Sequence, residues 1–149
     1  MRLTQQTNYA IRMLMYCNSK GRLATISEIA EFYNLSERFL TKILLSLTRS
    51  GFVKTVRGRN GGIQLARPSE KIFIGDVVRE VEGNFELAEC FQSGETTCPL
   101  VSSCGLNKAL SRALQGFFDI LNEHTLADIT SKKNVIYDLT VESRLTETP

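Results

Sequence analysis

Apolar residues recur with the spacing of one helical face near the start of the chain. Over residues 4–19, the positions i, i+3, i+4 and i+7 predict a helix whose apolar stripe consists of Ala10, Met13, Leu14 and Cys17. Ile11 and Met15 lie outside that stripe, so the helix is apolar on more than one side. Such a helix is usually covered on two sides, which favours contact with a partner subunit. Cys17 is expected to pack as a small core residue.

Two further helices are predicted next, with a tight turn between them. Thr25 and Glu28 have the spacing of a capping box at the start of a helix over residues 26–33. Ser36 caps the next helix, which runs to about Ser50. The inward stripe of that helix consists of Leu40, Ile43, Leu44 and Leu47. The pair predicts a helix-turn-helix, and a plain helical hairpin is the alternative.

Residues 52–66 predict a β-hairpin. Both flanks alternate and are rich in β-forming residues, and Asn60-Gly61 between them is a strong hairpin-turn signal. A hairpin directly after a helix-turn-helix is typical of a wing. The predicted fold class is therefore mainly α with a small β-hairpin wing, that is, a winged helix-turn-helix.

Two more helices are predicted beyond the wing. A short helix over 74–82 closes the winged part, and the longest helix runs from Leu106 to about Glu123. The stripe of the long helix consists of Leu106, Leu110, Ala113, Leu114, Phe117 and Leu121. It is longer than so small a domain needs, so we expect a long dimerisation helix, with an ordinary core helix as the alternative. The predicted divisions are a winged-helix DNA-binding domain (1–83), a cysteine-bearing loop (84–105), a dimerisation helix region (106–131) and a C-terminal tail whose last part is disordered (132–149).

Charge divides the chain into two halves, although the whole carries only +2. Residues 1–71 contain twelve Lys or Arg and four Asp or Glu, a net charge of +8, whereas residues 72–149 contain six and twelve, a net charge of −6. This division is expected when a nucleic-acid surface is joined to a sensing or assembly half. The sequence shows neither the apolar core of a signal peptide nor an apolar run of membrane length. We therefore expect a cytoplasmic protein with reduced thiols and no membrane partner.

The outward face of the helix after Ser36 and the wing carry residues suited to double-stranded operator DNA, with that helix in the major groove. Arginine can bond a guanine edge with two hydrogen bonds, and threonine or leucine can contact a thymine methyl group. The candidates for base contacts are therefore Arg38, Thr41 and Leu45. Contacts to phosphates or to a narrow minor groove are predicted for Lys42, Arg49, Lys54 and the wing residues Arg57, Arg59 and Asn60. Each basic residue alone would be an ordinary surface charge, and it is their shared face that predicts an interface.

Three of the four cysteines fall between residues 90 and 104. Seven residues separate Cys90 from Cys98 and five separate Cys98 from Cys104, and loop-forming residues fill the gaps. Zinc sites usually pair cysteines two to four residues apart, whereas these spacings suit an iron–sulfur cluster held at separated corners. The alternatives are reduced loop thiols without a ligand, or a disulfide with one thiol left over. His124, the only histidine, is too distant along the chain to share this site and is expected at the surface.

Four segments together form a known pattern: TNYAIRML near the N-terminus, the turn at Asn34, the wing VRGRNGGIQL, and three cysteines before a long helix. This pattern resembles the Rrf-type family of winged-helix iron–sulfur regulators, over residues 1 to about 130. The cysteine spacing and the sequence AECF around Cys90 are most similar to the rhizobial iron-regulator branch of that family.

The resemblance implies a homodimeric repressor that holds a [4Fe-4S] cluster through Cys90, Cys98 and Cys104, with [2Fe-2S] as a degraded or low-iron form. The cluster-bound form would bind the operators of iron-uptake genes, and loss of the cluster under low iron or oxidants would release the DNA. Two family positions differ. The nitric-oxide-sensing branch has an aspartate ligand where this chain has Asn8, and the biogenesis branch has a histidine ligand where this chain has Asn107.

The fourth ligand is therefore left open among water, a small thiol and a carboxylate such as Glu89 or Glu95. The functional alternatives are the same fold responding to nitric oxide, a metal-free thiol redox switch, and an iron–sulfur carrier or electron-transfer subunit. The last would leave the basic half and the wing without a role. Neither paired catalytic groups nor a small-molecule substrate site is indicated, so we expect no enzyme.

Overall fold

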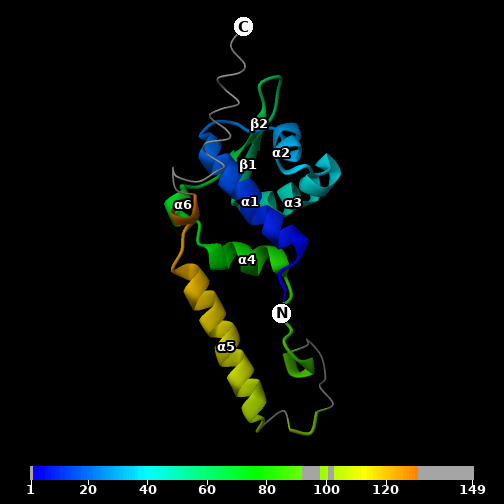
Figure 1. Ribbon diagram of the computed structural model, residues 1–149, viewed down its shortest axis with the longest axis vertical. Helices are drawn as coiled ribbons and strands as arrows, with labels where there is room; N and C mark the ends of the chain where they lie inside the picture. The colour runs from blue at the N-terminus through cyan, green and yellow to red at the C-terminus, as the bar shows by residue number, and fades with distance from the viewer. Residues whose placement is uncertain (1, 92–97, 101–102, 131–149) are drawn as a thin grey trace.

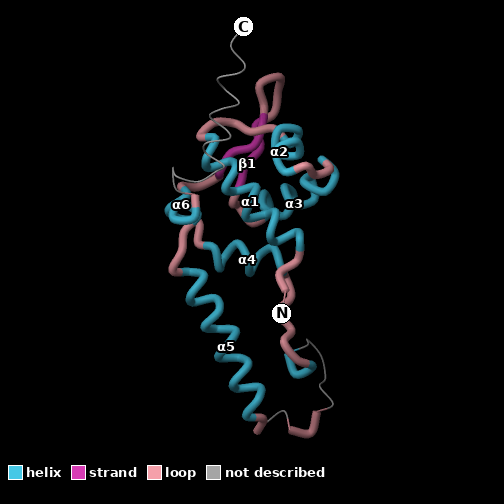
Figure 2. Tube along the Cα trace, in the orientation of Figure 1, coloured by secondary structure: helices cyan, strands magenta, loops and turns pink. Residues whose placement is uncertain are grey.

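The computed structural model describes residues 2–91, 98–100 and 103–130. Figure 1 shows a winged part, in which helices surround a hairpin, and a long helix that extends away from it. Helices dominate the trace in Figure 2, and the expected fold class is confirmed. The elements in chain order are α1 Gln5–Lys20, α2 Ile26–Tyr33, α3 Glu37–Arg49, β1 Val53–Val56, β2 Gly62–Leu65, the 3-10 helix η1 Ser69–Lys71, α4 Ile74–Glu82, the 3-10 helix η2 Glu89–Phe91, α5 Gly105–Asn122 and α6 Leu126–Ile129.

The helix boundaries follow the capping residues in the sequence. The side chain of Thr4 accepts a hydrogen bond from the Thr7 amide at the start of α1, and Ser36 does the same at the start of α3. α2 ends where Asn34 adopts a left-handed conformation with φ of 52°, which few residues other than glycine tolerate. The helices predicted over about 26–33 and over 74–82 are confirmed, although α4 begins without a side-chain cap.

α1 lies at the centre of the main core and contacts α3, α4, α6 and β2. Its predicted stripe is buried, and so are three of the four residues predicted for the inward face of α3. The fourth, Leu44, is partly buried against the same core. Ile11 and Met15, beside the α1 stripe, also pack against it. The second apolar side of α1 is therefore covered, at least in part, by the chain itself.

The wing is an antiparallel hairpin in which Val53 pairs with Leu65 and Val56 with Gly62. Its tip includes Asn60-Gly61, the predicted hairpin signal: the Gly61 amide donates to the Gly58 carbonyl oxygen at 2.9 Å and closes a turn over 58–61. A two-residue turn of the predicted type would need a positive φ at Asn60, but among the described non-glycine residues only Asn34 has one. The predicted hairpin is confirmed, and the turn at its tip is longer than a two-residue Asn-Gly turn.

The base of the wing is fixed to the chain just before α2. The Ala24 amide donates to the Ile63 carbonyl oxygen at 2.9 Å, and the Ile63 amide donates to the Ala24 carbonyl oxygen at 2.7 Å. A β-carbon on Gly62 would lie 2.7 Å from the Ala24 carbonyl oxygen, so this close approach requires glycine. The wing and the helix-turn-helix are therefore positioned by the same short segment.

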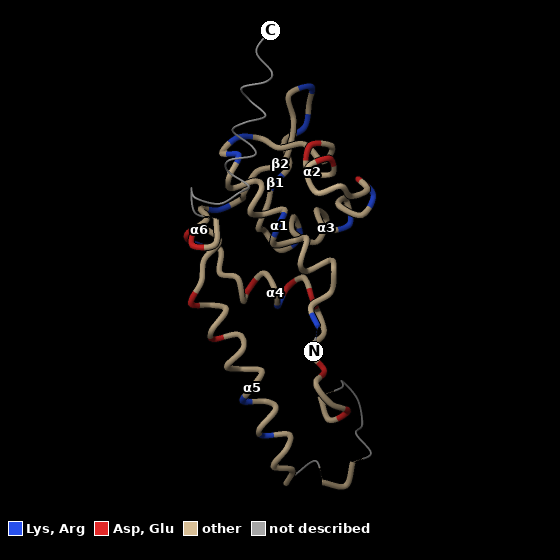
Figure 3. Tube along the Cα trace, viewed as in Figure 1, with Lys and Arg blue, Asp and Glu red and all other residues tan. Residues whose placement is uncertain are grey.

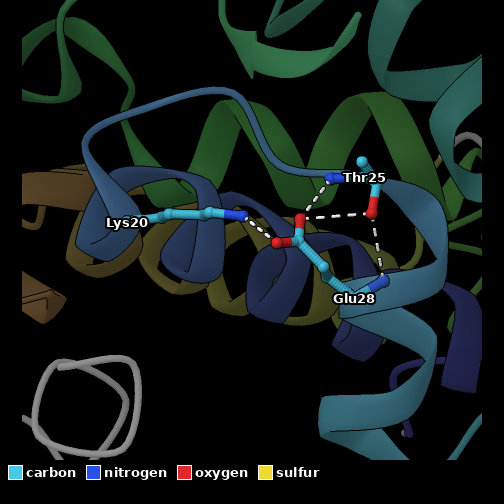
Figure 4. A network of polar contacts seen from close by, with 3 residues as sticks. All are labelled: Lys20, Thr25 and Glu28. Atoms are coloured by element: carbon cyan, nitrogen blue, oxygen red, sulfur yellow. Dashed lines mark hydrogen bonds and ion pairs between the residues drawn. The ribbon is translucent and has the colours of Figure 1, made fainter. Parts of the chain in front are cut away.

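A polar network fixes α2 against the end of α1 (Figure 4). The buried Lys20 donates a hydrogen bond to the carboxylate of Glu28. That carboxylate also accepts bonds from the amide of Thr25 at 2.7 Å and from its hydroxyl at 3.1 Å. Burial alone would raise the pKa of Glu28, but the hydrogen bonds from Lys20 and Thr25 lower it overall. The predicted capping box is thus present, and it also anchors the helix-turn-helix to α1.

A second, smaller core joins α4 to α5. Ile74 and Val78 pack with Phe118, which is the one buried residue of α5. A β-carbon on Gly75 would lie 2.2 Å from Asn122 Oδ1, so the two helices approach closely where α4 begins. The C-terminal half of α5 is therefore attached to the winged part.

The chain folds back after α5 in a way that the sequence analysis did not predict. The Ile74 amide donates to the His124 carbonyl oxygen at 3.0 Å, and the Leu126 amide donates to the Ile72 carbonyl oxygen at 2.7 Å. Thr125 and Asp128 form a capping box at the start of α6. The side chain of His124 is exposed, in agreement with the expected surface position.

Candidate functional site

The outward face of α3 carries the residues predicted to contact DNA bases. α3 is held by its buried inner stripe, so the opposite face turns to solvent. Leu45 is 62% exposed, so its apolar side chain is accessible to a thymine methyl group. The Thr41 hydroxyl donates to the Glu37 carbonyl oxygen at 2.8 Å, so its donor is used within the helix. The exposed residues of this face are Arg38, Thr41, Lys42, Leu45 and Arg49.

The wing supplies the second group of basic side chains. Lys54, Arg57, Arg59 and Asn60 are exposed, and Figure 3 shows Lys and Arg gathered at the tip of the hairpin and along α3. The structure thus places all nine predicted DNA-contact residues at the surface of the winged part. Their contacts with DNA stay a prediction.

Aromatic contacts set the angle between α1 and the helix-turn-helix. Tyr9 of α1 packs edge-on against Tyr33 and Phe39, with ring centroids 6.1 Å and 5.9 Å apart. The Tyr33 hydroxyl donates to the Arg12 carbonyl oxygen at 2.9 Å, and burial raises the pKa of Tyr33 well above its usual range. This cluster joins α1 to both helices of the DNA-binding pair and holds the exposed face of α3 in one orientation.

Two of the three predicted ligand cysteines meet at the N-terminus of α5. Cys104 is the N-cap residue of that helix, and its sulfur accepts a hydrogen bond from the Asn107 amide at 3.5 Å. The side-chain Nδ2 of the same Asn107 donates to Cys90 Sγ at 3.1 Å. All three residues are partly buried. Cys90 and Cys104, the first and last of the three clustered cysteines, are therefore brought together at the start of α5.

Cys98 is also described and partly buried, but the described residues do not bring three His, Cys, Asp or Glu side chains into one metal-binding group. The donor set itself suits iron, because cluster irons prefer thiolate ligands. The convergence of Cys90 and Cys104 on Asn107 fits such a site at two of its three predicted corners. Among the candidate fourth ligands, Glu89 is exposed next to Cys90, and Glu95 lies outside the described residues.

Cys17 has a different environment. It is 4% exposed within the main core, and burial raises the pKa of its thiol to about 12. This agrees with the expected structural role. Asn8, on the exposed side of α1, does not approach these cysteines through any described hydrogen bond.

Sequence reasoning considered Asn107 only as a missing histidine and overlooked its contact with the thiols. The spacing Cys104-Gly-Leu-Asn107 is that of an N-cap residue and the third residue of its helix, the arrangement used by capping boxes. That signal could have identified the bond to Cys104. The bond to Cys90 joins residues 17 positions apart, and no local pattern predicts it.

Comparisons with known proteins agree with this architecture. Residues 3–132 match the Rrf2 family, described as an iron-dependent transcriptional regulator. Protein aau3 of Rhizobium meliloti is 56% identical over 134 residues, which cover 89% of this chain and 87% of that protein. The HTH-type transcriptional regulator NsrR of Bacillus licheniformis is 40% identical over 141 residues, covering 93% of this chain and 99% of that protein.

A solved structure also shares the fold. The oxidized form of CymR from Staphylococcus aureus superimposes with a TM-score of 0.69 at 26% identity, over 91% of this chain and 100% of that one. Across the described part of the chain, the helices are too short or too polar to cross a membrane. The family match covers most of the chain and agrees with the winged helix-turn-helix. The chain therefore belongs to the Rrf2 family and is a DNA-binding transcriptional regulator, not an enzyme.

Proposed function

We propose that this regulator is an iron-responsive repressor that holds a [4Fe-4S] cluster through Cys90, Cys98 and Cys104 and binds operator DNA in the cluster-bound form. The observation that carries the proposal is the convergence of Cys90 Sγ and Cys104 Sγ on Asn107. The description of the family as iron-dependent supports the choice of signal.

The three thiolates would hold the cluster, and the cluster would supply a bridge whose presence depends on iron supply and on oxidants. Cys104 is fixed by α5, because it caps that helix. Cys90 lies within η2, at the end of the segment that leaves α4. Ligation by both would tie the α4–η2 connection to the start of α5.

A continuous set of contacts leads from this region to the DNA surface. α5 packs on α4, α4 packs on α1, and α1 packs on α3. A change in the position of α5 relative to α4 would therefore reach α3 through packed helices. We propose that cluster binding stabilises the arrangement in which two copies of α3 fit successive major grooves, about 34 Å apart.

The second copy of α3 requires a dimer, and α5 is the surface that we assign to it. Leu106 is 64% exposed and Ile120 is 59% exposed, although both lie on a helix with a long apolar stripe. An apolar stripe of this kind is covered by another element in a stable protein. A symmetric pair of α5 helices would cover it and would also fix the spacing of the two recognition helices. The predicted division into the domains 1–83, 84–105, 106–131 and 132–149 fits this arrangement and is part of the proposal; the tail from residue 131 lies outside the described residues.

The test is anaerobic purification, with absorbance spectra and native mass spectrometry on the same sample. The expected result is a brown dimer with one four-iron cluster per chain that binds operator DNA and releases it after iron chelation. Cys90→Ser, Cys98→Ser and Cys104→Ser should each weaken operator binding without unfolding the winged part. Operator affinity equal to that of the wild type in all three variants, under iron-replete anaerobic conditions, would refute the proposal.

A metal-free thiol switch is the second candidate, and the same pair of sulfurs favours it. Cys90 Sγ and Cys104 Sγ both accept hydrogen bonds from Asn107, the first from its side chain and the second from its backbone amide, and the similar CymR was solved in an oxidized form. A colourless protein that refuses cluster reconstitution but loses operator binding after diamide treatment would favour this candidate. For a brown protein, release of DNA by nitric oxide but not by iron chelation would instead favour nitric oxide as the signal.

A further inference from the structure

Asn107 uses two different N–H groups on two cysteines from opposite ends of the cysteine segment. Its backbone amide donates to Cys104 Sγ at 3.5 Å and its side-chain Nδ2 donates to Cys90 Sγ at 3.1 Å. Asn107 is partly buried at the start of α5. The backbone of Asn107 is therefore held by the helix, while its side chain reaches the sulfur of Cys90, which is 17 positions away in the chain.

We infer that Asn107 is a positioning residue for the iron–sulfur site: its side-chain amide holds the Cys90 sulfur beside Cys104 and donates to the ligating thiolate without binding iron. The inference rests on the proposed function, because it assigns a role toward the cluster proposed there. It adds a residue that lies outside the three cysteines and determines how firmly they hold the cluster.

The physical basis is charge on the ligating sulfur. A thiolate that accepts an N–H hydrogen bond is stabilised, and hydrogen bonds to the sulfurs are among the features that set cluster potential. Partners outside the first set of ligands also orient those ligands, and their loss weakens metal sites by about 10–100-fold. The positive end of the helix dipole lies at the start of α5, where it also stabilises negative charge on a cysteine sulfur.

Asn107 could donate a hydrogen bond to a cysteine sulfur or bind iron through its oxygen, and the two roles predict opposite effects of Asn107→Asp. The Asn107 side chain carries both a donor and an acceptor, and its amide nitrogen is the atom that faces Cys90. Asn107→Asp keeps the shape, removes the donor and adds a negative charge beside two thiolates. A donor role predicts a weaker site, whereas an oxygen ligand to iron would be strengthened by the carboxylate.

The experiment compares wild-type protein, Asn107→Ala and Asn107→Asp after anaerobic cluster reconstitution of the full chain. The readouts are the rate of iron release to a chelator, the one-electron reduction potential and the absorbance spectrum. Gln115→Ala is the matched control, because Gln115 is an exposed amide on the same helix that bonds Asp119 instead of a cysteine. Thermal unfolding of the apo-proteins checks that each variant folds.

Asn107→Ala is expected to bind the cluster, to release iron about tenfold faster and to have a lower reduction potential, because a hydrogen bond to the ligating sulfur is lost. Asn107→Asp is expected to release iron faster still, and Gln115→Ala should match the wild type. An Asn107→Ala cluster with unchanged release rate and potential would overturn this inference and leave the proposed function intact. Slower release from Asn107→Asp than from the wild type would also overturn it, in favour of ligation. A wild-type chain that takes up no iron would overturn both proposals.

Discussion

The hydroxyl of Thr7, which is buried in α1, donates a hydrogen bond to the carboxylate of Glu82, the last residue of α4. The same carboxylate accepts bonds from the Thr4 amide at 3.0 Å and from the Thr4 hydroxyl at 3.2 Å. The Glu82 side chain therefore joins the end of α4 to the start of α1, where it accepts the bonds of Thr4 and Thr7. Gly83 follows with φ of 70°, and the chain turns there toward the cysteines. The start of the cysteine-bearing loop predicted over 84–105 is thus anchored to α1, the helix at the centre of the core.

Glu82→Gln should lower the free energy of unfolding by about 1–2 kcal/mol. The substitution keeps the size of the side chain but removes the negative charge at the N-terminus of α1 and one of the two acceptor oxygens. Urea unfolding followed by circular dichroism measures the change. Glu80→Gln is the control, since Glu80 is exposed on the same helix and bonds only at 3.3 Å to Ser50 among the hydrogen bonds described for it. An equal loss of stability in both variants would contradict the anchoring role.

The contact between Lys20 and Glu28 predicts a dependence of stability on pH. Because its hydrogen bonds lower the pKa of Glu28 in the folded chain, ionised Glu28 stabilises the fold near neutral pH. That contribution is lost as the pH falls from about 4.3, the ordinary value for glutamate, through the lower folded value. Since Glu28 is partly exposed, we expect only about 1 kcal/mol.

The measurement is the free energy of unfolding between pH 7 and pH 3. Glu28→Gln should be less stable than the wild type at pH 7, and the difference should shrink toward pH 3. Glu31→Gln, an exposed position on the same helix, should show a constant difference. A Glu28→Gln curve parallel to that of the wild type would contradict the prediction.

The winged part could be predicted from the sequence because each signal there is local. The side chains of Thr25 and Ser36 mark helix starts by accepting bonds from backbone amides, and Asn34 marks a helix end by its left-handed backbone. The apolar spacing between them gives the buried faces. The hairpin could be predicted from Asn60-Gly61 and its β-forming flanks, although the connection between the strands is longer than two residues. α6 was missed because a helix of four residues has almost no periodicity, although its Thr125–Asp128 cap was visible.

The cysteine site could be predicted only in part. Its residue types and spacing indicated the chemistry, but the contact of Asn107 with Cys90 depends on how the α4–η2 connection returns to the start of α5. Contacts of this kind are fixed by tertiary packing, which hydrophobic spacing does not encode. The Glu82 anchor is a similar case, since it joins residues 75 positions apart in the chain.

The thiols should differ strongly in reactivity. Cys17 is buried and its pKa is raised to about 12, so little thiolate is present at pH 8. We expect iodoacetamide to modify Cys90 and Cys104 in the native apo-protein and to reach Cys17 only after denaturation. Peptide mass spectrometry after timed alkylation measures this order. Modification of Cys17 at the same rate as Cys104 would contradict the described burial.

The DNA surface predicts different effects for its two groups of residues. Arg38→Ala removes a candidate base contact from α3, so it should cost about 1–3 kcal/mol of binding free energy and relax the preference for one base pair. Arg59→Ala in the wing should weaken binding to all sequences and reduce the slope of affinity against salt by about 1. Fluorescence anisotropy with operator and scrambled DNA at several salt concentrations separates the two effects.

Arg112→Ala is the control for loss of one positive charge, because Arg112 is exposed on α5. It should leave the affinity for DNA close to that of the wild type. The cluster spectrum should stay unchanged in Arg38→Ala and Arg59→Ala. Equal losses of affinity in all three variants would indicate a general charge effect and would refute the assignment of α3 and the wing.

Two exposed leucines allow dimerisation and DNA binding to be separated. Leu106 on α5 is 64% exposed and Leu45 on α3 is 62% exposed, so the same change, leucine to glutamine, can be made at both. Leu106→Gln should weaken the dimer by about 1–3 kcal/mol, because an apolar side chain is then lost from the proposed interface, and operator affinity should fall with it. Leu45→Gln should lower operator affinity while leaving the dimer unchanged, since it acts at the DNA surface. Sedimentation equilibrium and operator binding on the same samples give the two readouts. A dimer that is equally stable in both variants would show that α5 does not form the interface at Leu106. A weaker dimer in Leu45→Gln would contradict the assignment of the exposed face of α3 to DNA.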